Sequence, residues 1–92
     1  MLTAFVFIHT DPKKIASVAR AIANLPNVAE VYSVTGDCDI IAVLRLGEYD
    51  QLAEIVPDAL AQIDGVVRTS TALAFRRYSA GDLTAAWDIG VS

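Results

Sequence analysis

Two aspartates lie close to a glycine in the short segment Thr35–Asp39, which joins two apolar stretches of the chain. The carboxylates of Asp37 and Asp39 can accept charge-assisted hydrogen bonds from an ammonium group. Backbone N–H groups around Gly36, which has no Cβ to block an approaching ligand, can donate to a carboxylate. The segment could therefore bind a small zwitterion, although Gly and Asp also dominate ordinary tight turns, and on the residues alone the turn is the simpler interpretation.

Hydroxyl groups recur on the last apolar stretch of the chain, as Thr69, Ser70 and Thr71. Side chains of a strand alternate, so Thr69 and Thr71 share one face and Ser70 points to the other. Thr69 and Thr71 are candidates for the wall of a binding pocket, while the strand preference of threonine explains them equally well. Tyr32 and Val34 also share a face, and they either line the side chain of a ligand or belong to the core.

The other reactive side chains do not form a catalytic or metal-binding set. His9 is the single histidine, and we expect it at a solvent edge or as a cap because no cluster of His and Cys accompanies it. Cys38 has no CxxC partner and no paired histidine, so it is interpreted as a small turn residue. The glycines form no phosphate-binding pattern. We therefore predict no catalytic residue, no metal and no cofactor.

Hydrophobic periodicity predicts four strands. Two of them are nearly unbroken apolar runs, which are typical of strands buried on both faces. The four ranges are Leu2–His9, Val28–Thr35, Ile40–Leu46 and Val66–Tyr78. The second and third should pair as a hairpin around Thr35–Cys38, so the candidate ligand-binding segment is expected at a hairpin turn.

Two helices are predicted between these strands. The first begins at Asp11-Pro12, where aspartate can cap the helix and proline suits its first position, and it ends at Pro26-Asn27. The second begins near Glu48, and Pro57 is expected to kink it or to break it in two. After the fourth strand, a short C-terminal helix is expected, capped by Asp82 and carrying Trp87, for which the sequence selects no role.

The chain repeats itself at an offset of 38 residues, which places Ala21–Val31 on Ala59–Thr69. Each half reads strand, helix, strand, so the predicted fold class is α+β, a ferredoxin-like βαββαβ arrangement with a four-stranded antiparallel sheet. Its helices cover one face of the sheet, and the other face would be a large apolar patch in a monomer. We therefore expect a homodimer that packs sheet on sheet.

The composition limits the partners. The chain has 92 residues, of which 54% are hydrophobic, and this is rich for a single small domain and favours a second buried surface at a subunit interface. The net charge of −4 does not favour nucleic-acid binding. A single cysteine and the lack of a membrane-length apolar run lead us to expect a cytoplasmic protein without membrane contact.

The hairpin segment Tyr32–Asp39 and the later run from Gly65-Val66 through Thr69-Ser70-Thr71 resemble the regulatory domain of Lrp/AsnC transcription factors, also called the RAM domain. The resemblance covers roughly residues 2–78, and it favours the ligand-binding interpretation of Gly36, Asp37 and Asp39. It implies residues 1–78 as a RAM-like effector-binding and oligomerisation domain, with 79–92 as a C-terminal tail. It further implies a dimeric α+β barrel type of assembly, as a homodimer, an octamer or a larger ring.

The resemblance also implies an amino acid as the effector, bound at contacts between dimers near the hairpin turn and the last strand. Full-length members carry an N-terminal helix-turn-helix, but here the first strand starts at Leu2, so a free-standing version without direct DNA binding is expected. Such a module would regulate transcription or metabolism through partner proteins, including full-length Lrp/AsnC regulators. The alternatives are a small cofactor-free oxygenase or isomerase of the same architecture and a scaffold without a ligand.

Overall fold

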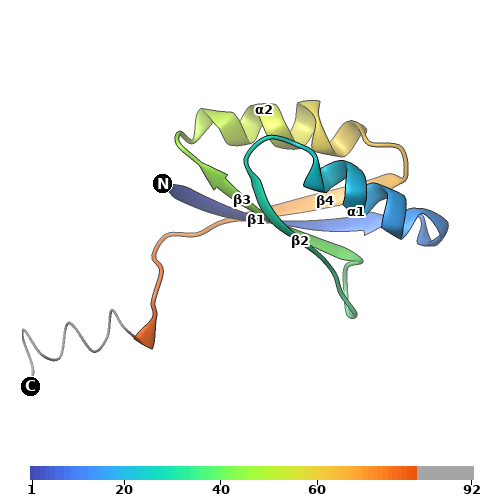
Figure 1. Cartoon of the computed structure of the whole chain (residues 1–92), viewed down its shortest axis with the longest axis horizontal. Coiled ribbons are helices and arrows are strands. Elements are labelled where there is room, and N and C mark those ends of the chain that lie inside the picture. The colour runs from blue at the N-terminus through green and yellow to red at the C-terminus, as the bar shows by residue number, and fades with distance from the viewer. Residues whose placement is uncertain (81–92) are drawn as a thin grey trace, which may run out of the picture.

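A computed structural model of the chain describes residues 1–80, which form one four-stranded sheet and two α-helices (Figure 1). Two short 3₁₀ helices, η1 and η2, adjoin the α-helices. The elements in chain order are β1 (Leu2–Thr10), η1 (Pro12–Lys14), α1 (Ile15–Ala23), β2 (Val28–Ser33), β3 (Ile40–Leu46), α2 (Asp50–Asp58), η2 (Leu60–Gln62) and β4 (Val66–Leu73). No helix among these residues is long and apolar enough to cross a membrane.

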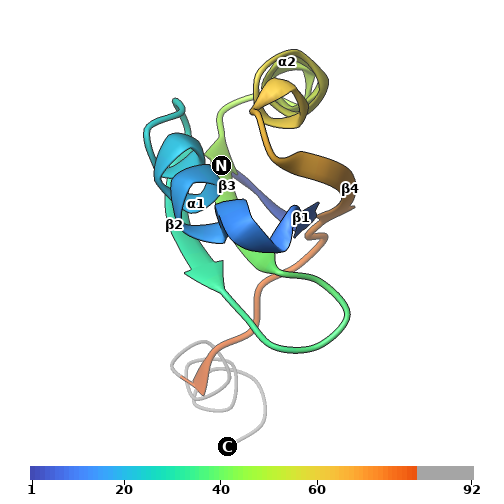
Figure 2. The same ribbon diagram turned by 90° about the vertical axis from the view of Figure 1, so that its right-hand side faces the viewer.

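The strand order is β2-β3-β1-β4, and every neighbouring pair is antiparallel. The two βαβ halves therefore interleave, so that β1 and β3 are central while β2 and β4 form the edges. Both helices lie over the same face of the sheet (Figures 1 and 2). This arrangement confirms the ferredoxin-like α+β fold that the internal repeat predicted.

The hydrophobic core lies between the helices and one face of the central strands. Val6 and Ile8 of β1 and Leu44 of β3 are completely buried there, each with 0% exposure. The helices cover them with three side chains that are also fully or almost fully buried, namely Val18, Ile22 and Ile55. The alternation along β1 and β3 thus directs one apolar set to the helices.

The opposite side of the sheet, here called the open face, carries the second apolar set of the same strands. Strand pairing aligns Phe5 with Val43 and Ala72, and Phe7 with Ile41 and Ser70; Ile41 in turn aligns with Tyr32. Phe5 is 37% exposed and Tyr32 is 50% exposed. The expectation that β1 is buried on both faces was therefore wrong for the single chain, because no helix covers this side.

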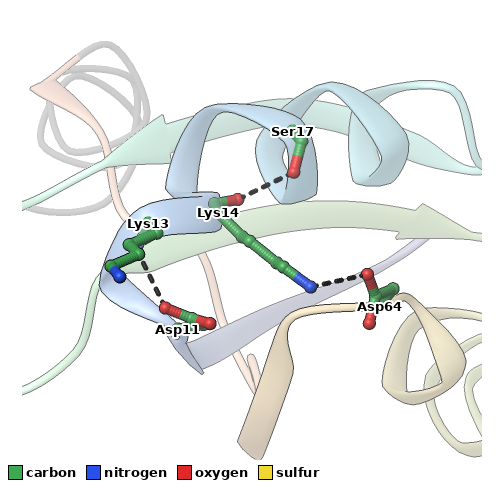
Figure 3. Close-up of polar contacts among 5 residues, drawn as sticks. All are labelled: Asp11, Lys13, Lys14, Ser17 and Asp64. Carbon is green, nitrogen blue, oxygen red and sulfur yellow. Dashed lines mark hydrogen bonds and ion pairs between the residues drawn. The ribbon is translucent and has the colours of Figure 1, made fainter.

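The helix boundaries follow the predicted capping and breaking residues. The Asp11 side chain accepts a hydrogen bond of 3.0 Å from the Lys13 N–H, which caps the first turn of η1 (Figure 3). The chain then continues into α1. Pro57 lies in the last turn of α2, which ends at Asp58 and gives way to the separate turn η2. The predicted break into two shorter helices is confirmed.

The fourth strand is shorter than its apolar pattern predicted. It ends at Leu73 rather than at Tyr78, because its neighbour β1 begins at Leu2. The Ala74 N–H donates a hydrogen bond of 2.9 Å to the Thr3 carbonyl, close to this start of β1. The predicted C-terminal helix with Asp82 and Trp87 lies outside the described residues.

Gly65 joins η2 to β4 where the two halves of the chain meet. Its carbonyl accepts a hydrogen bond of 2.8 Å from the Asp11 N–H. Gly65 has φ of +104°, and a Cβ at this position would lie 2.9 Å from Cγ2 of Val18 and 3.0 Å from Cβ of Lys14. The position therefore needs glycine for its backbone conformation and for its close contacts.

An exposed ion pair spans the same junction. The Lys14 ammonium donates to the Asp64 carboxylate at 2.8 Å (Figure 3). This hydrogen bond, together with the charge of Asp64, raises the pKa of Lys14 above its usual value of 10.5. Since the pair joins η1 to the loop before β4, it links the first half of the chain to the second.

The two positive-φ glycines give a matched test of the junction. Gly65→Ala should lower the free energy of unfolding by about 1–3 kcal/mol more than Gly36→Ala, because only a Cβ at position 65 would press against neighbouring side chains, those of Val18 and Lys14. Gly36 has φ of +118°, and a Cβ added to it would have no other atom within 4 Å, so it controls for backbone strain. Urea unfolding of both variants measures the difference, and equal losses would contradict the packing argument.

The Lys14–Asp64 pair should leave a signature at alkaline pH. A folded-state pKa above the unfolded value means that the stabilisation is complete below 10.5 and disappears as the pH rises through the folded pKa. Asp64→Asn should remove this alkaline component, which is small because both side chains are exposed. Urea midpoints across the alkaline range test this. Asp58→Asn is the control and should keep the wild-type slope.

Candidate functional site

The predicted ligand-binding segment lies in the hairpin turn of residues 34–39, which joins β2 to β3. The turn is closed by a hydrogen bond of 2.9 Å from the Val34 N–H to the Asp39 carbonyl. Gly36 is exposed at its tip with a positive φ of +118°, a conformation that L side chains rarely adopt. The backbone around Gly36 is therefore open to a ligand, and the hairpin prediction is confirmed.

Asp39 ties this turn to the end of β1. Its Oδ2 accepts a hydrogen bond of 2.8 Å from the Thr10 N–H, and its own N–H donates to the Ile8 carbonyl at 2.9 Å. Thr10 is buried and Asp39 is half-buried, so this carboxylate satisfies a backbone donor that is shielded from water. Asp39 thus has a structural role at the site, with Oδ1 as the oxygen that does not take part in that bond.

His9 and Arg68 gather at the same end of the sheet. The His9 Nε2 lies 2.5 Å from the Asp37 carbonyl oxygen, and because a carbonyl only accepts, we assign the proton to Nε2. Arg68 Nη2 lies 3.2 Å from the same nitrogen, but a guanidinium also only donates, so that contact is not a second hydrogen bond. The buried His9 Nδ1 has no partner within the described residues.

This hydrogen bond gives His9 a structural role between β1 and the hairpin turn. The ring is a link from β1 to the hairpin turn rather than a freely solvated edge residue, and Arg68 brings a positive charge beside it. The sequence had singled out neither residue for the site. No local sequence signal marks Arg68, because it is the strand register that aligns it with His9 across β1 and β4.

The two threonines lie on the other side of the sheet. Thr69 and Thr71 align with Ile8 and Val6, whose side chains face the helices, whereas Ser70 aligns with Phe7 on the open face. The predicted sharing of one face by Thr69 and Thr71 is therefore confirmed. Thr69 is half-buried and Thr71 is exposed, because β4 is an edge strand.

Tyr32 lies on β2, at the edge of the sheet opposite to β4. It is on the open face, and its hydroxyl donates to the Glu30 carboxylate. That hydrogen bond and the charge of Glu30 raise the pKa of Tyr32 above its usual value of 10.0. Val34 is half-buried beside the turn.

One chain therefore brings together only part of the predicted site. Val34, Gly36, Asp37 and Asp39 form the turn, while the Thr69 and Thr71 side chains are on the helix side of the far edge strand. Tyr32 is on the other face and at the other edge. A single ligand cannot touch all seven residues within one copy of the chain.

An open cleft of about 360 Å³ lies at the opposite end of the sheet, where β1 begins and β3 ends. It combines apolar side chains with arginines, and none of the predicted site residues contributes to it. The only sequence signal was the pair Arg76-Arg77, which is too short to count as a basic stripe. The lining residues include Leu2, Phe5, Arg45, Phe75, Arg76 and Arg77.

No metal centre is built from residues 1–80, since no three His, Cys, Asp or Glu side chains lie together there. Cys38 is a free, half-buried thiol in the turn, as its predicted role as a small turn residue implies. The chemistry of the turn is that of carboxylates and backbone amides, which suits a small polar ligand.

Known proteins share this sequence and this fold. An HTH-type transcriptional regulator of Pyrococcus furiosus is 38% identical over 76 residues, which cover 79% of this chain and 51% of the regulator. This chain thus spans about half the length of that curated relative. The crystal structure of TTHA0845 from Thermus thermophilus is 46% identical, with a TM-score of 0.82 over 86% of this chain and 99% of that one.

A feast or famine regulatory protein from M. tuberculosis, complexed with L-methionine, shares the fold with a TM-score of 0.72 at 23% identity, over 87% of this chain and 54% of that one. The Lrp/AsnC ligand binding domain itself matches residues 3–83. Because this match extends over most of the sequence and includes all four strands except the first residue of β1, the chain belongs to the Lrp/AsnC ligand binding domain family.

Proposed function

We propose that this chain is an amino-acid-sensing regulatory and oligomerisation module that acts on transcription or metabolism through partner proteins and not by binding DNA itself. The observation that carries the proposal is the exposed turn at Gly36, which is followed by two carboxylates and belongs to a domain of a ligand-binding family. An α-amino acid matches this turn chemically, because carboxylates accept from its ammonium group and backbone N–H groups donate to its carboxylate.

In this proposal, Asp37 is the principal acceptor for the ammonium group. Its side chain is exposed, whereas one oxygen of Asp39 already binds the Thr10 N–H. Gly36 supplies the open backbone for the ligand carboxylate. The L-methionine complex of the feast or famine protein supports an amino acid as the ligand class.

Val34 already lies in the turn, whereas Thr69, Thr71 and Tyr32 complete the pocket only if more than one copy contributes. The opposite placement of Tyr32 and the two threonines supports a site shared between chains. A ligand held at such a contact favours the assembly that contains the complete site, which couples ligand binding to oligomeric state.

The oligomer begins with a homodimer through the open face. This face presents Phe5, Phe7, Ile41 and Tyr32 with no helix over them, and contiguous apolar patches of this kind mark protein contacts. Octamers, larger rings and mixed assemblies with full-length Lrp/AsnC regulators extend this dimer. The net charge of −4 supports action through protein partners rather than on DNA.

The enzyme alternative would need His9 inside a cavity. Its Nε2 instead faces the Asp37 carbonyl at the end of the sheet, and the cleft is lined by residues at the other end. We therefore favour the regulatory module.

Ligand binding can be tested by thermal shift and calorimetry with each of the twenty amino acids. At least one should bind at millimolar concentration or below, and Asp37→Asn should weaken it about tenfold or more, since a charge-assisted hydrogen bond contributes about 1.5–3 kcal/mol. Asp58→Asn, an exposed aspartate in α2, is the matched control. If Asp37→Asn bound the amino acid with wild-type affinity, the site assignment would be wrong. If none of the twenty amino acids bound to the wild type, the proposal of amino-acid sensing would be wrong.

The dimer can be tested by sedimentation at micromolar concentration. The wild-type mass should be at least twice the 9.8 kDa of one chain. Phe7→Arg should shift the equilibrium toward monomers by more than about tenfold, because it buries an unpaired charge in the sheet-on-sheet contact. Tyr49→Arg, exposed at the start of α2, is the control and should stay wild-type. A wild type that sediments as a monomer would contradict the open-face dimer.

A further inference from the structure

The open cleft at the end of the sheet has no part in the proposed function. It lies where β1 begins and β3 ends, and the bond from the Ala74 N–H to the Thr3 carbonyl brings the chain after β4 to the same place (Figure 1). Its volume is about 360 Å³. Pockets for small molecules span about 300–1,000 Å³, so the cleft is large enough for a small ligand.

The charged side chains that line the cleft are all cationic. Arg45 belongs to β3, while Arg76 and Arg77 follow β4, so three of the seven basic residues of a chain with net charge −4 line one cleft. Among the described residues, no carboxylate lines it. Arg76 and Arg77 form no ion pair within residues 1–80. Because like charges in one place repel each other, the charge of the cleft selects an anionic ligand.

The Arg45 guanidinium is positioned by its neighbours but is only partly neutralised. Its Nη1 donates to Thr3 Oγ1 at 3.0 Å, and its Nη2 lies 4.0 Å from Glu30 Oε1, which is long for an ion pair. The Glu30 carboxylate also accepts a hydrogen bond from the Tyr32 hydroxyl. Arg45, Thr3 and Arg77 also line an open hollow beside the cleft. Guanidinium groups bind the oxygens of a phosphate or carboxylate in a bidentate geometry, so these arginines can hold the anionic group of a ligand.

The cleft also has an apolar side, which Leu2, Phe5 and Phe75 form. Phe75 is 102% exposed, so within residues 1–80 its ring is free to pack against a ligand. Aromatic rings pack well on one another, and nucleobases stack on such side chains. A phosphate monoester matches the cationic side better than a carboxylate does, because it carries a charge of about −2 and three acceptor oxygens.

We propose that this cleft binds a small phosphate monoester with an aromatic body, the class to which mononucleotides belong. The three arginines hold the phosphate, and Phe75 packs on the aromatic group. The inference does not rest on the amino-acid site, because the Gly36 turn lies at the other end of the sheet and none of that site's residues lines the cleft. It does not rest on the open-face dimer either, since all the lining residues come from one chain.

The test is calorimetry of the full chain with AMP and with phenyl phosphate. Each should bind at millimolar concentration or below. Arg77→Gln should weaken both at least about tenfold, since it removes a charge-assisted hydrogen bond to the phosphate. Arg20→Gln, an exposed arginine in the helix layer, is the matched control and should bind both ligands as the wild type does.

Adenosine and inorganic phosphate separate the two halves of the ligand. AMP should bind the wild type at least about tenfold more tightly than either of them, because only AMP occupies both sides of the cleft. Phe75→Ala should remove most of the advantage of AMP over inorganic phosphate and leave inorganic phosphate binding unchanged. Asp37→Asn should leave AMP binding unchanged, which keeps this site distinct from the amino-acid site.

Four outcomes would overturn the proposal. If neither AMP nor phenyl phosphate binds at millimolar concentration, the cleft is not a phosphate monoester site. If Arg77→Gln binds AMP as tightly as Arg20→Gln does, AMP binds elsewhere. If a single-stranded oligonucleotide binds far more tightly than AMP and Arg77→Gln abolishes its binding, the arginines serve a nucleic acid instead. If AMP binds only at dilutions where sedimentation shows the monomer, a second copy of the chain occupies the cleft in the dimer.

Discussion

Two helices can cover only one face of a four-stranded sheet, and the rest of this structure follows from that constraint. The helix layer buries Val6, Ile8 and Leu44, while Phe5, Phe7 and Ile41 on the same two central strands face the opposite side. A strand that is apolar on both faces gains its full stability only when both faces are covered. In the proposed function, a second copy of the chain covers this open face and completes the core.

The same sheet separates two ends with different chemistry. At one end, Asp39 and His9 bind the hairpin turn to β1 through a buried backbone donor and the Asp37 carbonyl. At the other end, an open cleft combines apolar side chains such as Leu2 and Phe5 with arginines. In the proposed function, the turn at the first of these ends holds a small zwitterion.

The two aspartates of the turn make different hydrogen bonds and therefore have different roles. Asp39 uses one oxygen to satisfy Thr10, so its removal would disturb the fold as well as any ligand. Asp37 contributes its backbone carbonyl to His9 and keeps its exposed side chain for solvent or ligand. Two residues of the same type, two positions apart, thus differ in role because one side chain points toward the end of β1.

Local signals were sufficient to predict the fold class, since the 38-residue repeat, the apolar runs, the cap at Asp11 and the break at Pro57 can all be read along the chain. They also located the turn around Gly36, because the formation of a turn depends on a few neighbouring residues. They overextended β4 to Tyr78, since an apolar pattern does not reveal where the neighbouring strand stops. The folded chain was needed to show that Tyr32 and Thr69 lie on opposite edges of the sheet, that Arg68 aligns with His9, and that residues 1–80 leave Phe75 exposed. These facts depend on strand order and register, which join residues distant in the chain and leave no mark on any single segment.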